Sequence, residues 1–306
     1  MGCVCPKKWR IAILVFFIGI SPCFSQAYRP YNQKFDLGTK ISRDFIGLRD
    51  NDRSYKPNTP LSAGLGFSLN NTIINIFLGY GLDDTIKENI GKTDFFDLQF
   101  HNYGRRFMVD LFFQQYRGFY SETDGLIMVY PDLSVRQCGA EVSYLINANK
   151  FSAKAAFGHT EQQLESGGSF IAGIGAYFNQ IEYDGEVFSE DKRLAHNLRA
   201  GASFGYAYSF VLSERWLLAG ALTCGAQIGN NAGRTHEGDL SANLANLFRF
   251  SIGYSVDNWC VSLDFIGNTQ YYGFFGDNAF SLISGNLGIK YLRRFYGAPF
   301  FLKNGK

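Results

Sequence analysis

The chain has 306 residues, of which 46% are hydrophobic and 17% aromatic, and its formal net charge is +2 at pH 7. This length suits one large domain or two small ones, and so small a charge gives no basis for nucleic acid as a partner. After the N-terminus no apolar run reaches the ~18 residues that a spanning helix needs, which excludes a helical membrane protein.

Residues 1–25 have the features of a secretory signal peptide. A basic stretch (residues 7–10) precedes ten apolar residues (11–20), and Cys23 and Ser25 place small residues at positions −3 and −1. We therefore expect cleavage before Gln26. The alternatives are a membrane anchor, for which ten apolar residues are too few, and a lipoprotein acylated on Cys23, which the preceding proline disfavours.

The mature chain keeps three cysteines: Cys138, Cys224 and Cys260. An odd number in three separate strand-like segments predicts neither a disulfide framework nor a metal site of C-x-x-C spacing. We interpret them as small residues of a wall, and predict no metal and no cofactor.

The segment of residues 198–212 shows the dominant pattern, in which large apolar residues alternate with small or polar ones. Leu198, Phe204 and Phe210 fall on one face of a strand, while Arg199 and Ser203 fall on the other. The pattern recurs from residue 61 onwards. In chain order the predicted strands cover residues 63–69, 74–80, 96–100, 107–113, 140–146, 151–157, 170–178, 198–212, 216–222, 248–256, 259–265 and 287–291.

These segments predict an all-β transmembrane antiparallel β-barrel over residues 61–306. A segment near residues 35–41, within the N-terminal stretch 26–60, is a candidate first strand. Because single-chain bacterial barrels have even strand numbers, we expect about 12 strands, with a range of ~10–14.

Turn lengths alternate between short and long, as expected when tight periplasmic turns face long external loops. The long connections are predicted at residues 82–92, 115–132, 230–243 and 267–280. The order slips by one around residues 180–196, which indicates a missed strand or a long periplasmic segment.

Isolated charges at mid-strand favour a membrane barrel over a soluble sandwich. The face opposite the apolar one is rich in Gly, Ser and Ala, and its few charges suit a narrow lumen in which each needs a partner. The predicted lumenal charge network contains Asp97, His101, Asp110, Glu141, Lys154, Arg199, Arg249, Asp264 and Lys290.

Three functions compete on this evidence. The first is a barrel of the Gram-negative outer membrane without a catalytic site, with a structural or surface-interaction role; its partners are outer-membrane lipid and, during biogenesis, the barrel assembly machinery. The second is a narrow channel for small solutes. The third is a lipid-modifying barrel enzyme that uses His101, which Asp97 and Asp110 are positioned to orient; however, no G-x-S-x-G or H-x-x-x-H motif is present.

Several strings carry a family resemblance. Residues 286–293 (NLGIKYLR) partly match the closing-strand signal of outer-membrane barrels: Asn286, Gly288 and Tyr291 fit and Arg293 does not. YKPN (55–58), TDFFDLQFHNYGRRFMVDLFFQQYRGFY (93–120) and GYAYSFVLSERW (205–216) resemble an uncharacterised family of Bacteroidota outer-membrane barrels, a domain of unknown function. The resemblance implies fold and location but no activity.

Overall fold

The computed structural model describes residues 27–50, 53–59, 61–69, 72–81, 90–183, 194–230, 240–272 and 280–297, so the expected signal peptide lies outside the described residues. The first half of the chain contains β1 (Tyr28–Pro30), β2 (Phe35–Asp50), β3 (Ser54–Pro57), β4 (Ser62–Leu69), β5 (Thr72–Gly81), β6 (Asp94–Tyr103), β7 (Phe107–Thr123) and β8 (Leu126–Leu145). The second half contains a π-helical turn η2 (Lys154–Gly158), β9 (Glu161–Gln163), β10 (Gly167–Glu182), β11 (Leu194–Val211), β12 (Trp216–Asn230), β13 (Leu240–Val256), β14 (Trp259–Tyr272) and β15 (Phe280–Phe295).

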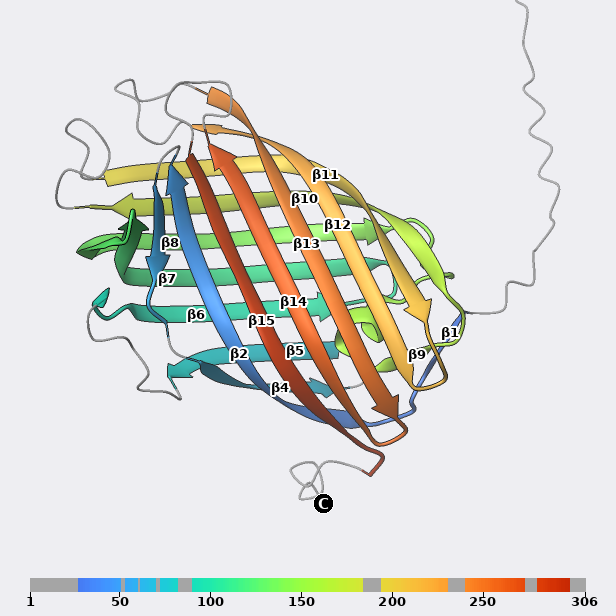
Figure 1. Ribbon diagram of the computed structural model, residues 1–306. Helices are drawn as coiled ribbons and strands as arrows, with labels where there is room; N and C mark the ends of the chain where they lie inside the picture. Colours follow the sequence, from blue (N-terminus) through green and yellow to red (C-terminus); the bar gives the residue numbers. More distant parts are fainter. Residues whose placement is uncertain are drawn as a thin grey trace, which may run out of the picture.

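The strands form an antiparallel sheet that closes on itself (Figure 1). Ten strands make the closed circuit β2–β3–β7–β8–β10–β11–β12–β13–β14–β15, and the last of them pairs with β2 again. At the seam, every residue of β15 from Phe280 to Phe295 has a register partner in β2 from Asp50 to Phe35. The predicted barrel class is therefore confirmed.

The pairing of strands in the wall differs between the two ends of the barrel. Near the short turns, residues 35–42 of β2 pair with β4, which pairs with β5, and β5 lies beside β6. Near the long loops, Leu48 and Arg49 of β2 pair instead with the short strand β3, which pairs directly with β7. The barrel is thus walled by fewer strands at its long-loop end.

Alternation sorts the side chains in the order opposite to that of a soluble protein. In β11, Leu198, Phe204 and Phe210 point outward and are 62%, 57% and 50% exposed, whereas Arg199 and Ser209 point into the lumen and are buried. Large apolar side chains cover the outer face, and most lumen-facing side chains of β11 are polar or small. No helix in the described part of the chain is long and apolar enough to cross a membrane.

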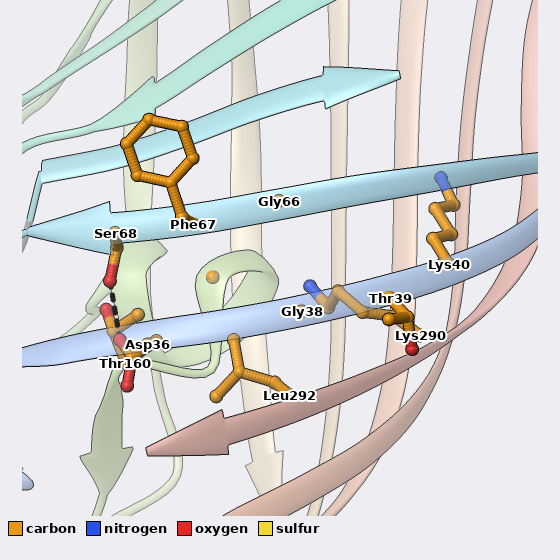
Figure 2. Close-up of a pocket in the computed structure, with 11 residues that line it drawn as sticks. Asp36, Gly38, Thr39, Lys40, Gly66, Phe67, Ser68, Thr160, Lys290 and Leu292 are labelled. Atoms are coloured by element: carbon orange, nitrogen blue, oxygen red, sulfur yellow. Dashed lines mark hydrogen bonds between the residues drawn. The ribbon is translucent and has the colours of Figure 1, made fainter. Parts of the chain in front are cut away.

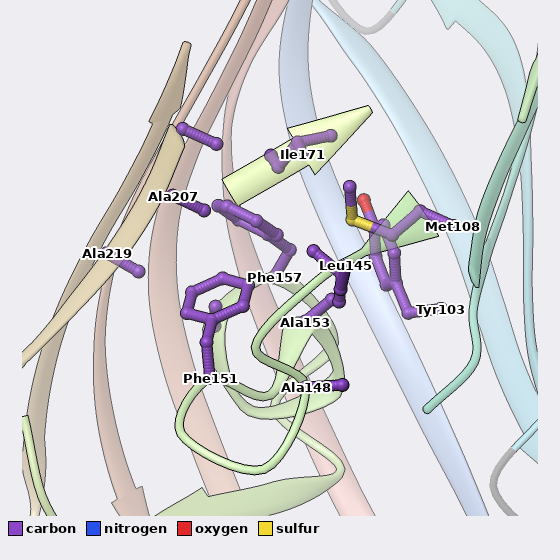
Figure 3. Close-up of a cluster of buried hydrophobic side chains, with 12 residues drawn as sticks. Tyr103, Met108, Leu145, Ala148, Phe151, Ala153, Phe157, Ile171, Ala207 and Ala219 are labelled. Atoms are coloured by element: carbon purple, nitrogen blue, oxygen red, sulfur yellow. The ribbon is translucent and has the colours of Figure 1, made fainter. Parts of the chain in front are cut away.

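The predicted strand over residues 151–157 is wrong. This stretch overlaps η2, and the residue after η2, His159, has a left-handed backbone (φ 58°). The chain then continues into β9, which pairs with β1. Phe151 and Phe157 are buried inside the barrel against Ala207 and Ala219 of the wall (Figure 3). We call residues 147–166 the plug. Without a strand here β8 pairs directly with β10, and successive connections lie at opposite ends of the barrel, which explains the slip predicted near residues 180–196. Residues 184–193 lie outside the described residues.

The predicted long connection over residues 115–132 is also wrong. There β7 and β8 continue as a hairpin whose turn is Asp124–Gly125, with positive φ at both residues (52° and 80°). Asp-Gly is the sequence that favours such a turn, because it tolerates left-handed backbone at both central positions. Of the other predicted long connections, residues 82–89, 231–239 and 273–279 lie outside the described residues.

The three cysteines of the described chain are free thiols. Cys224 is exposed on the outer face and Cys138 is half-buried, in keeping with small wall residues. Cys260 is buried on the lumenal side, so it is not a residue of the outer face.

Candidate functional site: a sealed polar layer in the lumen

The lumen contains a polar layer between two apolar ones. At the short-turn end, the plug forms the first apolar layer with residues of the surrounding wall, and its members include Met108, Leu145 and Ile171 (Figure 3). At the long-loop end, a second buried apolar cluster is formed by Ile46, Leu48, Tyr55, Tyr116, Phe119, Tyr130, Leu133, Val135, Ile181 and Leu282. This second cluster belongs to β2, β3, β7, β8, β10 and β15, whereas buried polar side chains such as Asn197 and Gln270 occupy the same end on the facing strands.

An ion pair crosses the polar layer. Arg249 of β13 and Asp110 of β7 project from opposite walls, five strands apart in the circuit in either direction, and the guanidinium binds the carboxylate through Nη2 and Oδ2. The other carboxylate oxygen, Oδ1, lies 2.6 Å from Nδ1 of His101. Asp110 thus neutralises Arg249 and orients His101, and this contact ties the two walls together.

A second acidic centre joins the wall to the plug. Asp264 of β14 lies 3.3 Å from Nζ of Lys290 and accepts hydrogen bonds from Ser251 (2.6 Å) and Ser262 (2.9 Å). Nε2 of His159 in the plug lies 3.4 Å from the same carboxylate. Lys290 also donates to the carbonyl of Phe157 at 3.1 Å, so the neighbouring strands β14 and β15 hold the end of η2 through two contacts.

Two lysines face the lumen side by side. Lys40 of β2 and Lys290 of β15 are register partners, and like charges directly opposite each other destabilise a sheet unless acceptors surround them. Lys40 donates to the side-chain oxygen of Asn286, whose amide donates to Asp44. Figure 2 shows both lysines lining a pocket with Asp36, which accepts a hydrogen bond from Ser68 at 2.5 Å.

The remaining predicted acids lie among neutral donors. Asp97 accepts hydrogen bonds from Gln114 (2.7 Å), Tyr116 (2.9 Å) and Gln99 (3.0 Å). Glu141 accepts one from Tyr177 at 2.6 Å, with Ser143 and Ser203 at 3.3 Å. Both carboxylates are buried, and hydroxyl and amide groups supply the donors that a buried carboxylate requires.

The other two predicted bases have different surroundings. Arg199 is buried near the long-loop end, where it donates to the side chain of Asn197 and, at 3.3 Å, to the carbonyl of Tyr271. Lys154 lies on η2 rather than on a wall strand, is half-buried, and forms no ion pair within the described residues.

Sequence reasoning missed the residues that hold the plug in place. Arg294 donates to the carbonyls of Val256 (2.6 Å) and Trp259 (3.1 Å) and to that of His159 (2.5 Å), and its guanidinium lies 3.7 Å from the centre of the Tyr31 ring. Burial raises the pKa of Tyr31, which keeps this phenol neutral. Lys40 and Asp44 were also missed, although they share the lumenal parity of β2, because this strand precedes the first clear alternating segment.

His101 lines a cavity of the polar layer. Lys40 and Arg249 from the walls and Phe157 from the plug line the same cavity. Both ring nitrogens of His101 have partners, Asp110 and, at 3.4 Å, Gln99; within the described residues the ring has no hydrogen bond to a serine, threonine or cysteine. No group of three or more metal-ligating side chains that could hold an ion occurs in the described ranges.

Several solved structures are similar in fold at low identity. Outer-membrane expressed OmpT of Vibrio cholerae shares 10% identity over 84% of this chain and 96% of that chain, with a TM-score of 0.32. The outer membrane protease OmpT from Escherichia coli shares 9% identity over 85% and 97% (TM-score 0.36), and the P. putida toluene transporter TodX shares 9% over 86% and 90% (TM-score 0.30). These values are too low to carry an inference about the lumen.

A search of curated proteins finds no match to the sequence. A family model, described as a domain of unknown function (DUF4421), matches residues 28–295. The match covers every strand of the barrel, and the chain therefore belongs to this family.

Proposed function

We propose that this protein is an outer-membrane β-barrel whose lumen is closed to solutes and which has no catalytic site. The outer face supports the membrane placement, because it exposes large apolar side chains along strands whose inner face is polar. With the usual orientation of bacterial barrels, the short turns and the plug face the periplasm. Export by a cleaved signal peptide, delivery to the barrel assembly machinery and an origin in the Bacteroidota belong to the same proposal.

The arrangement of side chains in the lumen is the observation that supports the closed state. Buried side chains fill both ends, with the apolar plug at the short-turn end and a mixture of apolar and polar side chains at the long-loop end. The cross-lumen pair of Arg249 and Asp110 joins opposite walls between them. A water-filled pore would need a continuous polar path from one mouth to the other. Such a barrel would act through its outer surface, its loops or its contacts with lipid.

Planar-bilayer recording tests this closure. The purified protein should give no discrete conductance steps under conditions in which an open porin conducts. Steps recorded from the unmodified protein would contradict the closed lumen. The non-catalytic part is tested by incubating the protein with phospholipid in detergent micelles: product release that disappears in His101→Ala would contradict it.

A gated channel is the second candidate, and one cavity favours it. This cavity runs along small residues of the wall, among them Gly175, Gly201 and Gly225, with Glu141 and Gln227 at its side. It lies on the long-loop side of the plug, whose aromatic rings pack on Ala207 and Ala219 of the same wall. Conductance that is absent in the native protein and appears when residues 149–164 are replaced by a short glycine–serine turn would support this candidate.

A further inference from the structure

Two strands begin with the same arrangement of an arginine, an aromatic residue and a tyrosine. At the start of β7, Arg106 precedes Phe107, which is the register partner of Tyr144 in β8. At the start of β12, Arg215 precedes Trp216, whose register partner is Tyr254 in β13. Both arrangements lie on the outer face at the short-turn end; we call them the Arg106 clasp and the Arg215 clasp.

The two clasps agree in their side-chain geometry. Nη1 of Arg106 donates to the hydroxyl of Tyr144 at 2.8 Å, and Nη1 of Arg215 donates to that of Tyr254 at 3.1 Å. The rings of Phe107 and Tyr144 lie 5.2 Å apart at an interplanar angle of 60°, and those of Trp216 and Tyr254 have the same distance and angle.

Their backbones agree as well. The residue after each tyrosine donates its N–H to the carbonyl of the arginine: Leu145 to Arg106 at 2.7 Å, and Ser255 to Arg215 at 2.8 Å. Each arginine is therefore fixed at its main chain and at its guanidinium, although the side chain is exposed. A lone exposed contact of this kind adds little to stability, so its repetition indicates another use.

Each clasp presents unused donors beside an exposed ring. A guanidinium has five N–H groups, and the tyrosine hydroxyl accepts from one of them. Phe107 and Trp216 are 53% and 44% exposed, and they continue into the apolar outer face of the barrel. Aromatic rings at a barrel rim mark the depth of lipid headgroups, and a planar guanidinium fork matches two oxygens of a phosphate.

We propose that each clasp binds the phosphate of a phospholipid in the leaflet at the short-turn end, with an acyl chain against the neighbouring apolar strand face. This inference rests on the proposed membrane placement but not on the closure of the lumen. The Arg106 clasp binds more tightly than the Arg215 clasp, because Arg106 follows the exposed Arg105 whereas Arg215 follows the exposed Glu214.

Native mass spectrometry of the detergent-purified protein tests the proposal, with phosphatidylglycerol as the probe and diacylglycerol of the same chains as the phosphate-free comparison. We expect the native protein to retain phosphatidylglycerol but not diacylglycerol, and the double variant Arg106→Gln/Arg215→Gln to bind it about tenfold more weakly, since a charge-assisted hydrogen bond is lost at each clasp. Arg106→Gln alone should weaken retention more than Arg215→Gln alone.

The matched control is Arg117→Gln, which removes an exposed arginine that pairs with Asp132 at 3.1 Å on the other half of β7. It should leave lipid retention unchanged. Equal retention by the double variant, or equal retention of diacylglycerol, would overturn the clasps as phosphate sites. Flotation with phosphatidylglycerol vesicles separates the two proposals: if the native protein does not float, the membrane placement fails, whereas if native and double variant float alike and retain lipid alike, only the clasps fail.

Discussion

Strand β11 and the plug share one sequence pattern, but β11 is part of the barrel wall and the plug lies inside the lumen. Residues 198–212 alternate large and small side chains over fifteen positions and form a strand whose apolar face is exposed. Residues 151–157 alternate in the same way, with Phe151 and Phe157 at the two ends, yet form a π-helical turn inside the barrel. The short segment finds apolar partners in the lumen, where Ala207 and Ala219 leave room for its rings. Alternation over a few residues therefore does not by itself distinguish a wall strand from a segment packed inside the lumen.

The largest effect is expected where the lumen holds its opposite walls together. Arg249→Ala leaves the Asp110 carboxylate buried with only His101 beside it, and should lower the free energy of unfolding by about 3–5 kcal/mol. Urea unfolding in detergent micelles, followed by the heat-induced gel shift, measures the loss. Arg117→Ala, which breaks an exposed pair, should cost about 0–1 kcal/mol. Equal losses would mean that Arg249 is hydrated and the lumen is open.

Phe151→Ala distinguishes a plug from a wall strand. Phe151 is fully buried in the apolar cluster, so its truncation should cost roughly 3 kcal/mol by leaving a cavity. The comparison variant is Phe210→Ala, at the half-exposed end of β11, which should cost clearly less. If both changes shift the unfolding midpoint equally, residues 151–157 lie on the outer face after all.

A charge placed on each face of β11 tests the facing of the wall. Phe204→Arg should destabilise the protein by about 2–4 kcal/mol, because the new charge faces hydrocarbon. Ser203→Arg places a cation next to Glu141, at the lumenal cavity that Gly201 and Gly225 line, and should cost less. Unfolding in vesicles gives both values; no difference between the two variants would favour a soluble sheet.

The smallest effect is expected at the contact between plug and wall. His159→Asn keeps a residue that tolerates the left-handed backbone but shortens the reach to Ser251 and Asp264, and should cost about 1–2 kcal/mol. Hydrogen exchange should then speed up at residues 150–163 before it changes in the wall. His196→Asn, at an exposed site, serves as the control and should leave exchange in the plug unchanged.

Much of the wall could be predicted from the sequence, because a period of two fixes which side chains share a face. Asp110 and Arg249 were assigned to the lumen on this ground, and both are buried there. Their pairing could not be predicted, since it depends on strand register and on the closed strand order that places β7 opposite β13. Glu141 shows the same limit: parity placed it inside, but its donor, Tyr177, depends on how β8 and β10 align.

The plug and the clasps escaped prediction for different reasons. The plug could not be predicted from its own sequence, because the apolar surface that it packs against inside the lumen forms only when the wall strands are assembled. The hairpin of β7 and β8 has a readable signal in the sequence, because Asp124–Gly125 is followed directly by the apolar run of residues 126–130. The clasps were present as the short strings GRRF and SERW, but the tyrosines that complete them come from neighbouring strands.

The seam between β2 and β15 determines when the barrel can finish folding. Its register partners are separated by more than two hundred residues, so the contacts that close the ring are the most distant in the chain. The stacked rings of Phe35 and Phe295, 4.5 Å apart, and the bond from the N–H of Lys34 to the carbonyl of Phe295 form only after all other strands are in place. Until then, β2 and β15 present unpaired edges, which are templates for aggregation. Closure is thus the slow, late step on entropic grounds, and the unfinished barrel is the species that most needs protection in the cell.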